Sequence, residues 1–346
     1  MRVIQVGVGD FGRSWVEVLS GASGVELAGV VDPSPAARQW ITQELGIPPE
    51  QCFESLDDAL TGTVADAVLV ATPELTHCEV ARTALEAGKH VLVEKPLTTT
   101  VQDAQLLIET AARTGRIVMA SQNYRYRPPA RTMQRLVREG ALGTLQSVKI
   151  SCRRDTRSLW PSLPYRYQMR HPYLTGMAIH HFDLLRAITG EDARKIYARS
   201  WRAPDSPYLH HPAMAAILEL ECGATVIYEG DWAPHDTETS WDGAWELVGE
   251  TGRLTRRIGG GGLEAVVLQL WGGAPHVVEQ EQLAYTDRAA TLEVLRMAVE
   301  EGEPPETVAT DNIRSVAMVA GCLQSIETGS QVDVAALIAS RACYRV

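Results

Sequence analysis

Residues 3–12 read Val-Ile-Gln-Val-Gly-Val-Gly-Asp-Phe-Gly, a short apolar run that leads directly into a GxGxxG pattern. Glycines at these places permit a tight turn and let backbone N–H groups approach a phosphate at the start of a helix. A run with helical spacing follows from residue 11 to residue 20, and an aspartate ends the next strand-like run. This order of strand, turn, helix and acid predicts a dinucleotide site formed by Gly7, Gly9, Asp10, Phe11, Gly12 and Asp32.

Strand-like and helix-like runs alternate through the first 120 residues. Apolar runs predict strands over 3–6, 26–31, 67–71, 90–93 and 117–120. Helical spacing and capping residues predict helices over 11–20, 35–45, 76–87 and 100–114. Alternation of this kind indicates a doubly wound parallel sheet with both faces covered, which is a Rossmann arrangement.

The pattern changes near Asn123, beyond which strands dominate. Strands are predicted over 145–152, 194–201, 213–221, 224–228, 244–248 and 252–255, and helices over 130–138, 176–189, 289–301 and 310–327. Consecutive strands favour a mostly antiparallel open sheet with helices on one face. We therefore expect a dinucleotide-binding Rossmann domain over 1–122 and a substrate-binding and oligomerisation domain over 123–346. The C-terminal helices of the second domain can pack back on the first.

Composition excludes several classes of protein. The chain has 346 residues, enough for about two domains, and its net charge of −11 argues against nucleic-acid binding, which needs a basic surface. No apolar stretch is long enough to cross a membrane, and we expect no signal peptide, because a strand is predicted from residue 3. The six cysteines are scattered without a CxxC pair. Such spacing fits free thiols in a reducing compartment, so we expect a cytoplasmic protein.

Glu94-Lys95-Pro96 follows directly after the apolar run His90-Val91-Leu92-Val93. Ligands of a parallel sheet bind at the carboxyl ends of its strands, so a lysine here can reach the reactive end of a bound dinucleotide. Glu94 can hold that lysine or a ribose. Thr72 and Pro73 end the preceding strand at the same edge, and we expect both to contact the cofactor. His77 has either a cofactor role or a packing role.

Five features of the chain resemble the Gfo/Idh/MocA oxidoreductase family, which includes inositol dehydrogenases and glucose–fructose oxidoreductase. They are the glycine turn, Ala71-Thr72-Pro73 with His77, Glu94-Lys95-Pro96, Asn123-Tyr124-Arg125, and the helix with His180 and Asp183. The resemblance covers nearly the whole chain. It implies an NAD(P)-dependent dehydrogenase for a sugar, cyclitol or related polyol. It also implies a cofactor contact for Asn123, and a homodimer or homotetramer formed through the sheet of the second domain.

The choice of cofactor depends on Asp32. Its carboxylate can accept hydrogen bonds from a ribose diol and would repel a 2′-phosphate, so NAD is expected. Ser34 and Arg38 lie close by in the sequence, and either could contact a phosphate. NADP therefore stays possible at this stage.

Transfer of hydride from a secondary alcohol requires a proton acceptor and a group that stabilises the developing oxyanion. We expect Lys95 to supply the stabilising charge and to take part in proton transfer. His180 resembles the family's general acid/base histidine, and Asp183 shares its helix face and can fix its tautomer. His181 is the alternative. The family often has an aspartate four residues before this histidine, where this chain has Gly176.

The substrate pocket is expected to include Arg125, Trp160, Arg166, Tyr173 and His181, because aromatic faces suit the C–H faces of sugar rings and arginine donates to hydroxyls. Adjacent histidines on a helix point apart, so no metal site is expected. Two other functions stay open. One is an enzyme that oxidises and re-reduces a sugar with a tightly held NAD, giving net glycoside hydrolysis or epimerisation. The other is a nucleotide or sugar sensor without chemistry.

Overall fold

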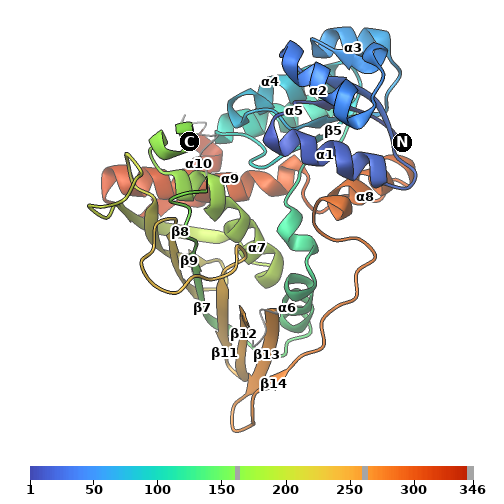
Figure 1. Ribbon diagram of the computed structural model, residues 1–346. Coiled ribbons are helices and arrows are strands. Elements are labelled where there is room, and N and C mark those ends of the chain that lie inside the picture. Colours follow the sequence, from blue (N-terminus) through green and yellow to red (C-terminus); the bar gives the residue numbers. More distant parts are fainter. Residues whose placement is uncertain (160–163, 259–263, 341–346) are drawn as a thin grey trace. The chain divides into compact units, whose positions relative to one another are not determined.

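The computed structural model describes residues 1–159, 164–258 and 264–340, and its chain divides into two compact units (Figure 1). The first unit comprises Met1–Asn123 and Tyr285–Val316, and the second comprises Tyr124–Ala284 and Ala317–Val346. The segment Tyr285–Val316, which interrupts the second unit in the sequence, is thus part of the first unit. This segment contains helix α8 (Asp287–Glu300).

The first unit is built on a six-stranded sheet in the order β3-β2-β1-β4-β5-β6, with every pair parallel. Strand order reverses between β1 and β4, and ligands of doubly wound sheets bind at the carboxyl edge of such a switch point. The doubly wound parallel fold predicted from the alternation is confirmed. The strands are β1 (Arg2–Val6), β2 (Glu26–Val31), β3 (Cys52–Phe53), β4 (Ala67–Val70), β5 (His90–Val93) and β6 (Val118–Ala120).

Local signals place the helices of this unit. Ser34 caps α2 and Thr100 caps α5 through side-chain oxygens that accept backbone N–H groups, while Gly46 and Gly115 end the same helices in the left-handed conformation. The sequence analysis did not predict β3 or helix α3. A strand of two residues is too short to show a periodic pattern. The helices are α1 (Asp10–Gly21), α2 (Pro35–Leu45), α3 (Leu56–Gly62), α4 (His77–Glu86) and α5 (Val101–Thr114).

The second unit is built on a nine-stranded sheet in the order β14-β13-β12-β11-β7-β10-β9-β8-β15. Its pairs are antiparallel except β7 with β10, so the expected mostly antiparallel sheet is confirmed. The four consecutive glycines at 259–262, which the sequence suggests as a flexible loop, lie outside the described residues. The strands are β7 (Leu145–Arg153), β8 (Ala193–Trp201), β9 (Ala213–Leu220), β10 (Thr225–Asp231), β11 (Ala244–Gly249), β12 (Gly252–Ile258), β13 (Glu264–Leu270), β14 (His276–Val277) and β15 (Val332–Asp333).

Helices α6 (Pro128–Arg138) and α7 (Ile179–Thr189) pack against each other beside this sheet (Figure 1). A single π-helical turn, Leu174–Ala178, precedes α7. Helix α9 (Ala309–Thr328) and helix α10 (Val334–Ser340) complete the described chain. In the described residues, every helix is too short or not apolar enough to span a bilayer.

A buried polar network ties α7 to the sheet of the second unit. The hydroxyl of Tyr228 lies 2.9 Å from the Tyr173 hydroxyl and 2.9 Å from His181 Nδ1, while His181 Nε2 lies 2.9 Å from the Trp241 carbonyl oxygen. Tyr173 and His181 are fully buried. Gly230 leaves room for the Tyr173 ring, which a Cβ there would overlap.

This burial corrects two sequence predictions. Tyr173 and His181 were expected to line the substrate pocket, but both side chains are enclosed and their polar atoms are used inside the second unit. The carbonyl of Trp241 can only accept a hydrogen bond, so His181 donates from Nε2 and accepts at Nδ1. A neutral imidazole satisfies both contacts, and burial lowers the pKa of His181 to about 4. We therefore assign both residues to the core.

The buried His181 predicts a stability that depends on pH. An unfolded histidine takes up a proton near pH 6.5, whereas native His181 resists it until about pH 4. Stability is therefore lost as the pH falls through this window. Urea unfolding at pH 7.5 and pH 4.5 should show a difference that His181→Gln reduces by about 2 kcal/mol. An equal pH dependence in the wild type and the variant would contradict this assignment.

Candidate active site

The glycine turn between β1 and α1 is held by close backbone approach. Gly7 has a φ of +92°, and a Cβ there would lie 2.6 Å from the carbonyl oxygen of Ala71 at the end of β4. A Cβ on Gly12 would overlap the carbonyl oxygen of Gly7. A Cβ on Gly9 would meet nothing within 4 Å. The outer two glycines thus serve packing, while the central one leaves open space at the start of the helix.

The N-terminus of α1 fits a pyrophosphate. Gly9 is its N-cap, and no side chain caps the helix, which begins at Asp10. The backbone N–H groups of a first helical turn lack partners within the helix and favour an anion. The Phe11 ring beside them is 47% exposed. The open space at Gly9 and the uncapped helix together provide the cradle that a dinucleotide phosphate needs.

Asp32 lies next to this turn, where β2 ends. Its Oδ2 accepts the Val8 N–H at 3.0 Å, and its Oδ1 accepts the Ser34 N–H at 2.9 Å. Both bonds fix the carboxylate beside the glycine turn. Arg38 donates to the carbonyl oxygen of Asp32 at 2.6 Å and pairs with Glu54 at 3.5 Å. The arginine that could have met a 2′-phosphate therefore has partners in the protein, and the arrangement fits NAD.

Lys95 leaves the end of β5 and approaches the glycine turn of the same unit. Its Nζ lies 6.0 Å from the centroid of the Phe11 ring. Glu94 fixes the turn that carries the lysine, because its Oε1 accepts the Trp15 indole N–H at 2.8 Å and its Oε2 accepts the Lys95 backbone N–H at 2.9 Å. The glutamate thus ties the lysine turn to helix α1, which begins at the predicted phosphate cradle.

His77 joins two turns at this edge of the sheet. Its Nδ1 lies 2.7 Å from the Pro96 carbonyl oxygen, and its Nε2 lies 2.9 Å from the Thr72 carbonyl oxygen. The side chain is buried. Both ring nitrogens are engaged inside the unit, which favours the packing role over the cofactor role that the sequence also left open for His77, and the ring holds the turns after β4 and β5 together.

The remaining predicted cofactor contacts lie in the same unit. The Thr76 hydroxyl donates to Thr72 Oγ1 or to the Pro73 carbonyl oxygen, each at 2.8 Å, which closes the turn between β4 and α4. Asn123 Nδ2 donates to Asp287 Oδ1 at 3.0 Å. The amide of Asn123 thus links the end of the first segment of the unit to the start of α8. The contacts of Thr72, Pro73 and Asn123 with a cofactor stay predictions.

His180 lies in the second unit and stacks on Tyr124. The two rings are 4.2 Å apart at their centroids and inclined by 15°. The guanidinium of Arg127 lies 3.7 Å from the centroid of the Tyr124 ring. Arg127 in turn pairs with Asp242. The stack fixes the plane of the His180 imidazole, which is buried on α7.

Asp183 and Arg125 form a buried bidentate ion pair. Arg125 Nε lies 2.6 Å from Asp183 Oδ2, and Arg125 Nη2 lies 2.7 Å from Asp183 Oδ1. Both side chains are buried. The expected substrate contact of Arg125 does not agree with this pairing, which uses its guanidinium inside the second unit. The role of Asp183 as a partner of His180 stays a prediction.

Gly176 lies one turn before His180, in the π-helical turn. A Cβ there would lie 2.8 Å from Cη2 of Trp232, whose ring is almost fully buried. The indole fills the space into which a side chain at position 176 would extend. An aspartate at this place, as the family often has, is therefore sterically excluded while Trp232 keeps its position.

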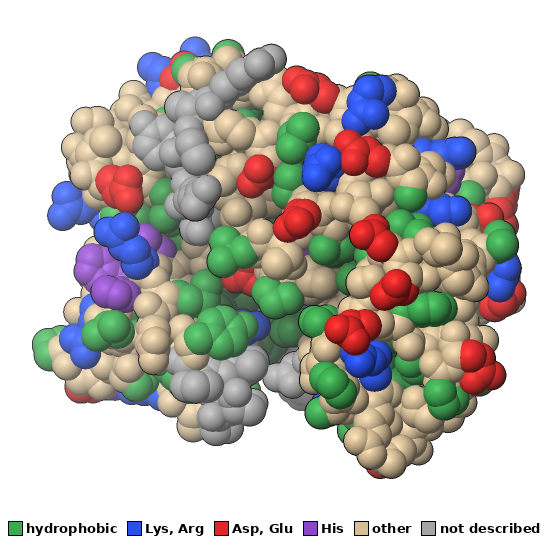
Figure 2. Space-filling model, turned by 90° about the horizontal axis from the view of Figure 1, so that it is seen from above, with side chains coloured by type: hydrophobic (Ala, Val, Ile, Leu, Met, Phe, Trp, Pro, Cys, Tyr) green, Lys and Arg blue, Asp and Glu red, His purple; other side chains and the backbone are tan. Residues whose placement is uncertain are grey.

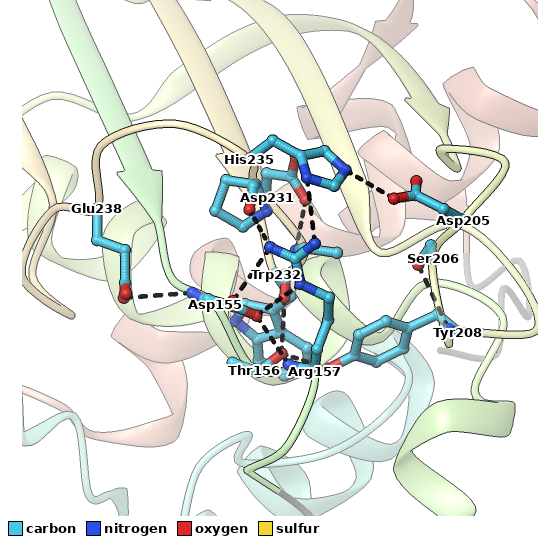
Figure 3. A network of polar contacts seen from close by, with 12 residues as sticks. Asp155, Thr156, Arg157, Asp205, Ser206, Tyr208, Asp231, Trp232, His235 and Glu238 are labelled. Carbon is cyan, nitrogen blue, oxygen red and sulfur yellow. Dashed lines mark hydrogen bonds and ion pairs between the residues drawn. The ribbon is translucent and has the colours of Figure 1, made fainter.

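Trp232 is anchored by the loops shown in Figure 3. Its carbonyl oxygen accepts hydrogen bonds from the Thr156 N–H at 3.0 Å and the Thr156 hydroxyl at 2.8 Å. Arg157, next in the chain, donates to Asp155 at 2.9 Å, and His235 pairs with Asp205 at 3.0 Å. The loop that follows β7 thus holds the backbone of Trp232, whose ring fills the space beside Gly176.

The structure gives little information on the predicted substrate contacts of Trp160 and Arg166. Trp160 lies outside the described residues. Arg166 lies in the short 3₁₀ segment Pro164–Gln168, with its guanidinium 5.9 Å from the Tyr165 ring.

Among the residues that the structure describes, no group of three or more His, Cys, Asp or Glu side chains is arranged to hold a metal ion. Acidic and basic side chains are interspersed on the face seen in Figure 2.

The sequence analysis assigned no role to Tyr124, on which His180 stacks, and left Trp232 open between sheet-face packing at an oligomer interface and a pocket. Tyr124 stands inside the quoted Asn123-Tyr124-Arg125 motif, so its closeness to a functional helix was a usable signal. Trp232 carried no such signal, because its contact with Gly176 joins positions 56 residues apart.

Comparison with known proteins agrees with the fold of both units. Residues 1–122 match the GFO/IDH/MocA model described as an oxidoreductase family with an NAD-binding Rossmann fold, and residues 130–255 match the GFO/IDH/MocA C-terminal domain. Inositol 2-dehydrogenase 1 of Saccharopolyspora erythraea is 29% identical over 349 residues, which cover 96% of each chain.

Solved structures share the fold. A crystal structure of an oxidoreductase from Agrobacterium radiobacter in complex with NAD+, L-tartaric acid and magnesium has a TM-score of 0.87 at 19% identity and covers 97% of this chain and 99% of its own. The aldose-aldose oxidoreductase from Caulobacter crescentus, complexed with glycerol, has a TM-score of 0.83 at 22% identity, over 96% and 99% of the two chains. The chain belongs to the GFO/IDH/MocA oxidoreductase family, and residues 1–122 are its NAD-binding Rossmann fold.

Proposed function

We propose that this oxidoreductase is a dehydrogenase that oxidises a secondary alcohol of a sugar, cyclitol or related polyol, or reduces the corresponding ketone. The observation that carries the proposal is the approach of Lys95 to the glycine turn, with its Nζ 6.0 Å from the Phe11 ring. A cation at the end of a central strand stands where the reacting end of a dinucleotide is expected. When bound, NAD accepts or donates the hydride.

The residues of this chain bind the cofactor and handle the proton. The cradle at Gly9 receives the pyrophosphate, and Asp32 receives a ribose diol. Lys95 stabilises the oxyanion that develops as the alcohol loses its proton, and His180, held flat by Tyr124, exchanges that proton. Glu94 keeps the backbone of the lysine turn in place. Asp183 lies on the same helix as His180, where the ion pair with Arg125 fixes its carboxylate.

The names of relatives support the substrate class. The relatives of comparable length include an inositol 2-dehydrogenase and a D-apiose dehydrogenase, the latter 23% identical over 96% of this chain. A panel of cyclitols, aldoses and other polyols, assayed by NADH absorbance with NAD+ and NADP+ in parallel, tests the proposal. Conversion of a sugar without accumulation of NADH would instead indicate an enzyme that recycles its NAD. No conversion of any member would contradict the proposed substrate class.

Lys95→Met removes the cation and keeps most of the side-chain volume. We expect kcat to fall by about a thousandfold, because the oxyanion loses its stabilising charge, while NAD+ affinity changes by less than about threefold. Lys89→Met, in the same unit, is the matched control and should retain activity. Steady-state kinetics and calorimetric titration with NAD+ check both parts. A Lys95→Met enzyme with wild-type turnover would refute the assigned role.

Asp32→Ser removes the carboxylate that would meet a 2′-phosphate. The ratio of kcat/KM for NADP+ to that for NAD+ should rise by about tenfold or more, because the charge that repels a 2′-phosphate is lost. Asp57→Ser on α3 is the control for a lost surface carboxylate. The prediction fails if the ratio stays at the wild-type value.

Tyr124→Leu removes the ring on which His180 stacks, whereas Tyr124→Phe keeps it. We expect the leucine variant to lose about tenfold in kcat and the phenylalanine variant to stay within about threefold of the wild type. Pre-steady-state measurement of NADH formation separates the chemical step from product release. Equal losses in both variants would assign the effect to the hydroxyl rather than to stacking.

A further inference from the structure

Gln5 is a polar residue in the middle of an apolar strand. It is fully buried in β1, between Ile4 and Val6, and its neighbours across the sheet are Val30 on β2 and Leu69 on β4. Central strands of parallel sheets are normally continuous apolar runs. A buried amide is costly unless its polar atoms are bonded, and departures from local rules concentrate at functional sites.

The side chain of Gln5 bridges the two ends of the glycine turn. Its Nε2 donates to the carbonyl oxygen of Gly7 at 2.9 Å and to the carbonyl oxygen of Gly12 at 2.7 Å. A primary amide nitrogen carries two protons, so one proton serves each carbonyl. The amide cannot be rotated, because Oε1 would then face two carbonyl oxygens. Gln5 thus bonds to the first and last glycines of the GxGxxG pattern.

The opposite side of the amide shows that this arrangement has a cost. Oε1 of Gln5 is buried and has no hydrogen-bond partner in the described structure. A buried acceptor without a partner destabilises the folded chain, and an aliphatic residue at this position would avoid the penalty. The two bonds to the turn are the contacts that the glutamine provides and an aliphatic residue would not.

We propose that Gln5 is a positioning residue for the cofactor: its two donated hydrogen bonds hold the glycine turn in the shape that presents the first N–H groups of α1 to the NAD pyrophosphate. The open space at Gly9 lies between the two clamped carbonyls in the sequence. Close approach alone limits how near the ends of the turn can come, whereas the clamp limits how far apart they can move. The inference rests on NAD binding by this turn.

Gln5→Met and Gln5→Leu test the proposal. Both remove the donors together with the unsatisfied acceptor, so the folded chain should survive. Calorimetric titration of the full chain with NAD+ should show a Kd raised by about tenfold or more, and the KM for NAD+ should rise in parallel. With saturating NAD+, kcat should stay within about twofold of the wild type, because the chemical groups are unchanged.

Gln105→Met on α5 is the matched control. Gln105 also has a buried Oε1 without a hydrogen-bond partner in the described structure, and it is remote in sequence from the glycine turn. This variant should bind NAD+ as the wild type does. Thermal unfolding of the apo proteins gives the readout of a purely structural role. Hydrogen exchange of the amides of residues 8–11 should quicken in the two Gln5 variants alone.

Two results would overturn the inference. One is NAD+ affinity within about twofold of the wild type in both Gln5 variants. The other is a loss of affinity no larger than in Gln105→Met. Failure of the wild-type chain to bind NAD+ is a different outcome, since it would remove the cofactor assignment and the inference with it.

Discussion

The close approach of backbone at the switch point of the first sheet supports the rest of the site. Gly7 brings the end of β1 against the carbonyl of Ala71 at the end of β4, at a separation that leaves no room for a Cβ. Because β1 and β4 are central strands, this contact decides where helix α1 begins and in which direction its first N–H groups point. Every other element of the nucleotide site is arranged around that point.

Polar side chains inside the first unit link the turns that surround this backbone contact. Glu94 links the lysine turn to Trp15 on α1, and His77 links the turns after β4 and β5. Gln5 links the two ends of the glycine turn. These side chains are wholly or partly buried, where a lost partner is expensive, so each contact holds its turn more firmly than the same contact on the surface would.

The second unit uses glycine and large aromatic rings in pairs. Gly176 admits Trp232 beside the helix of His180, and Gly230 admits Tyr173 beside the sheet. Because glycine has no Cβ, a buried ring can pack close to the backbone at each of these two positions. The consequence for chemistry lies at position 176, where an indole takes the space that the family often gives to a carboxylate. His180 is instead held by the stack on Tyr124.

The sequence by itself determined the elements that depend on neighbouring residues. The glycine pattern, the alternation of strands and helices, Asp32 and the position of Lys95 at a strand end all follow from local spacing and sheet geometry. Tertiary structure alone decided which polar groups are enclosed. His77, Tyr173, His181 and Arg125 resemble site residues in the sequence, yet their partners come from distant segments and use their polar atoms. Periodicity determines which face of an element is buried, but the partner of a buried polar atom depends on how whole elements pack, and no local pattern carries that information.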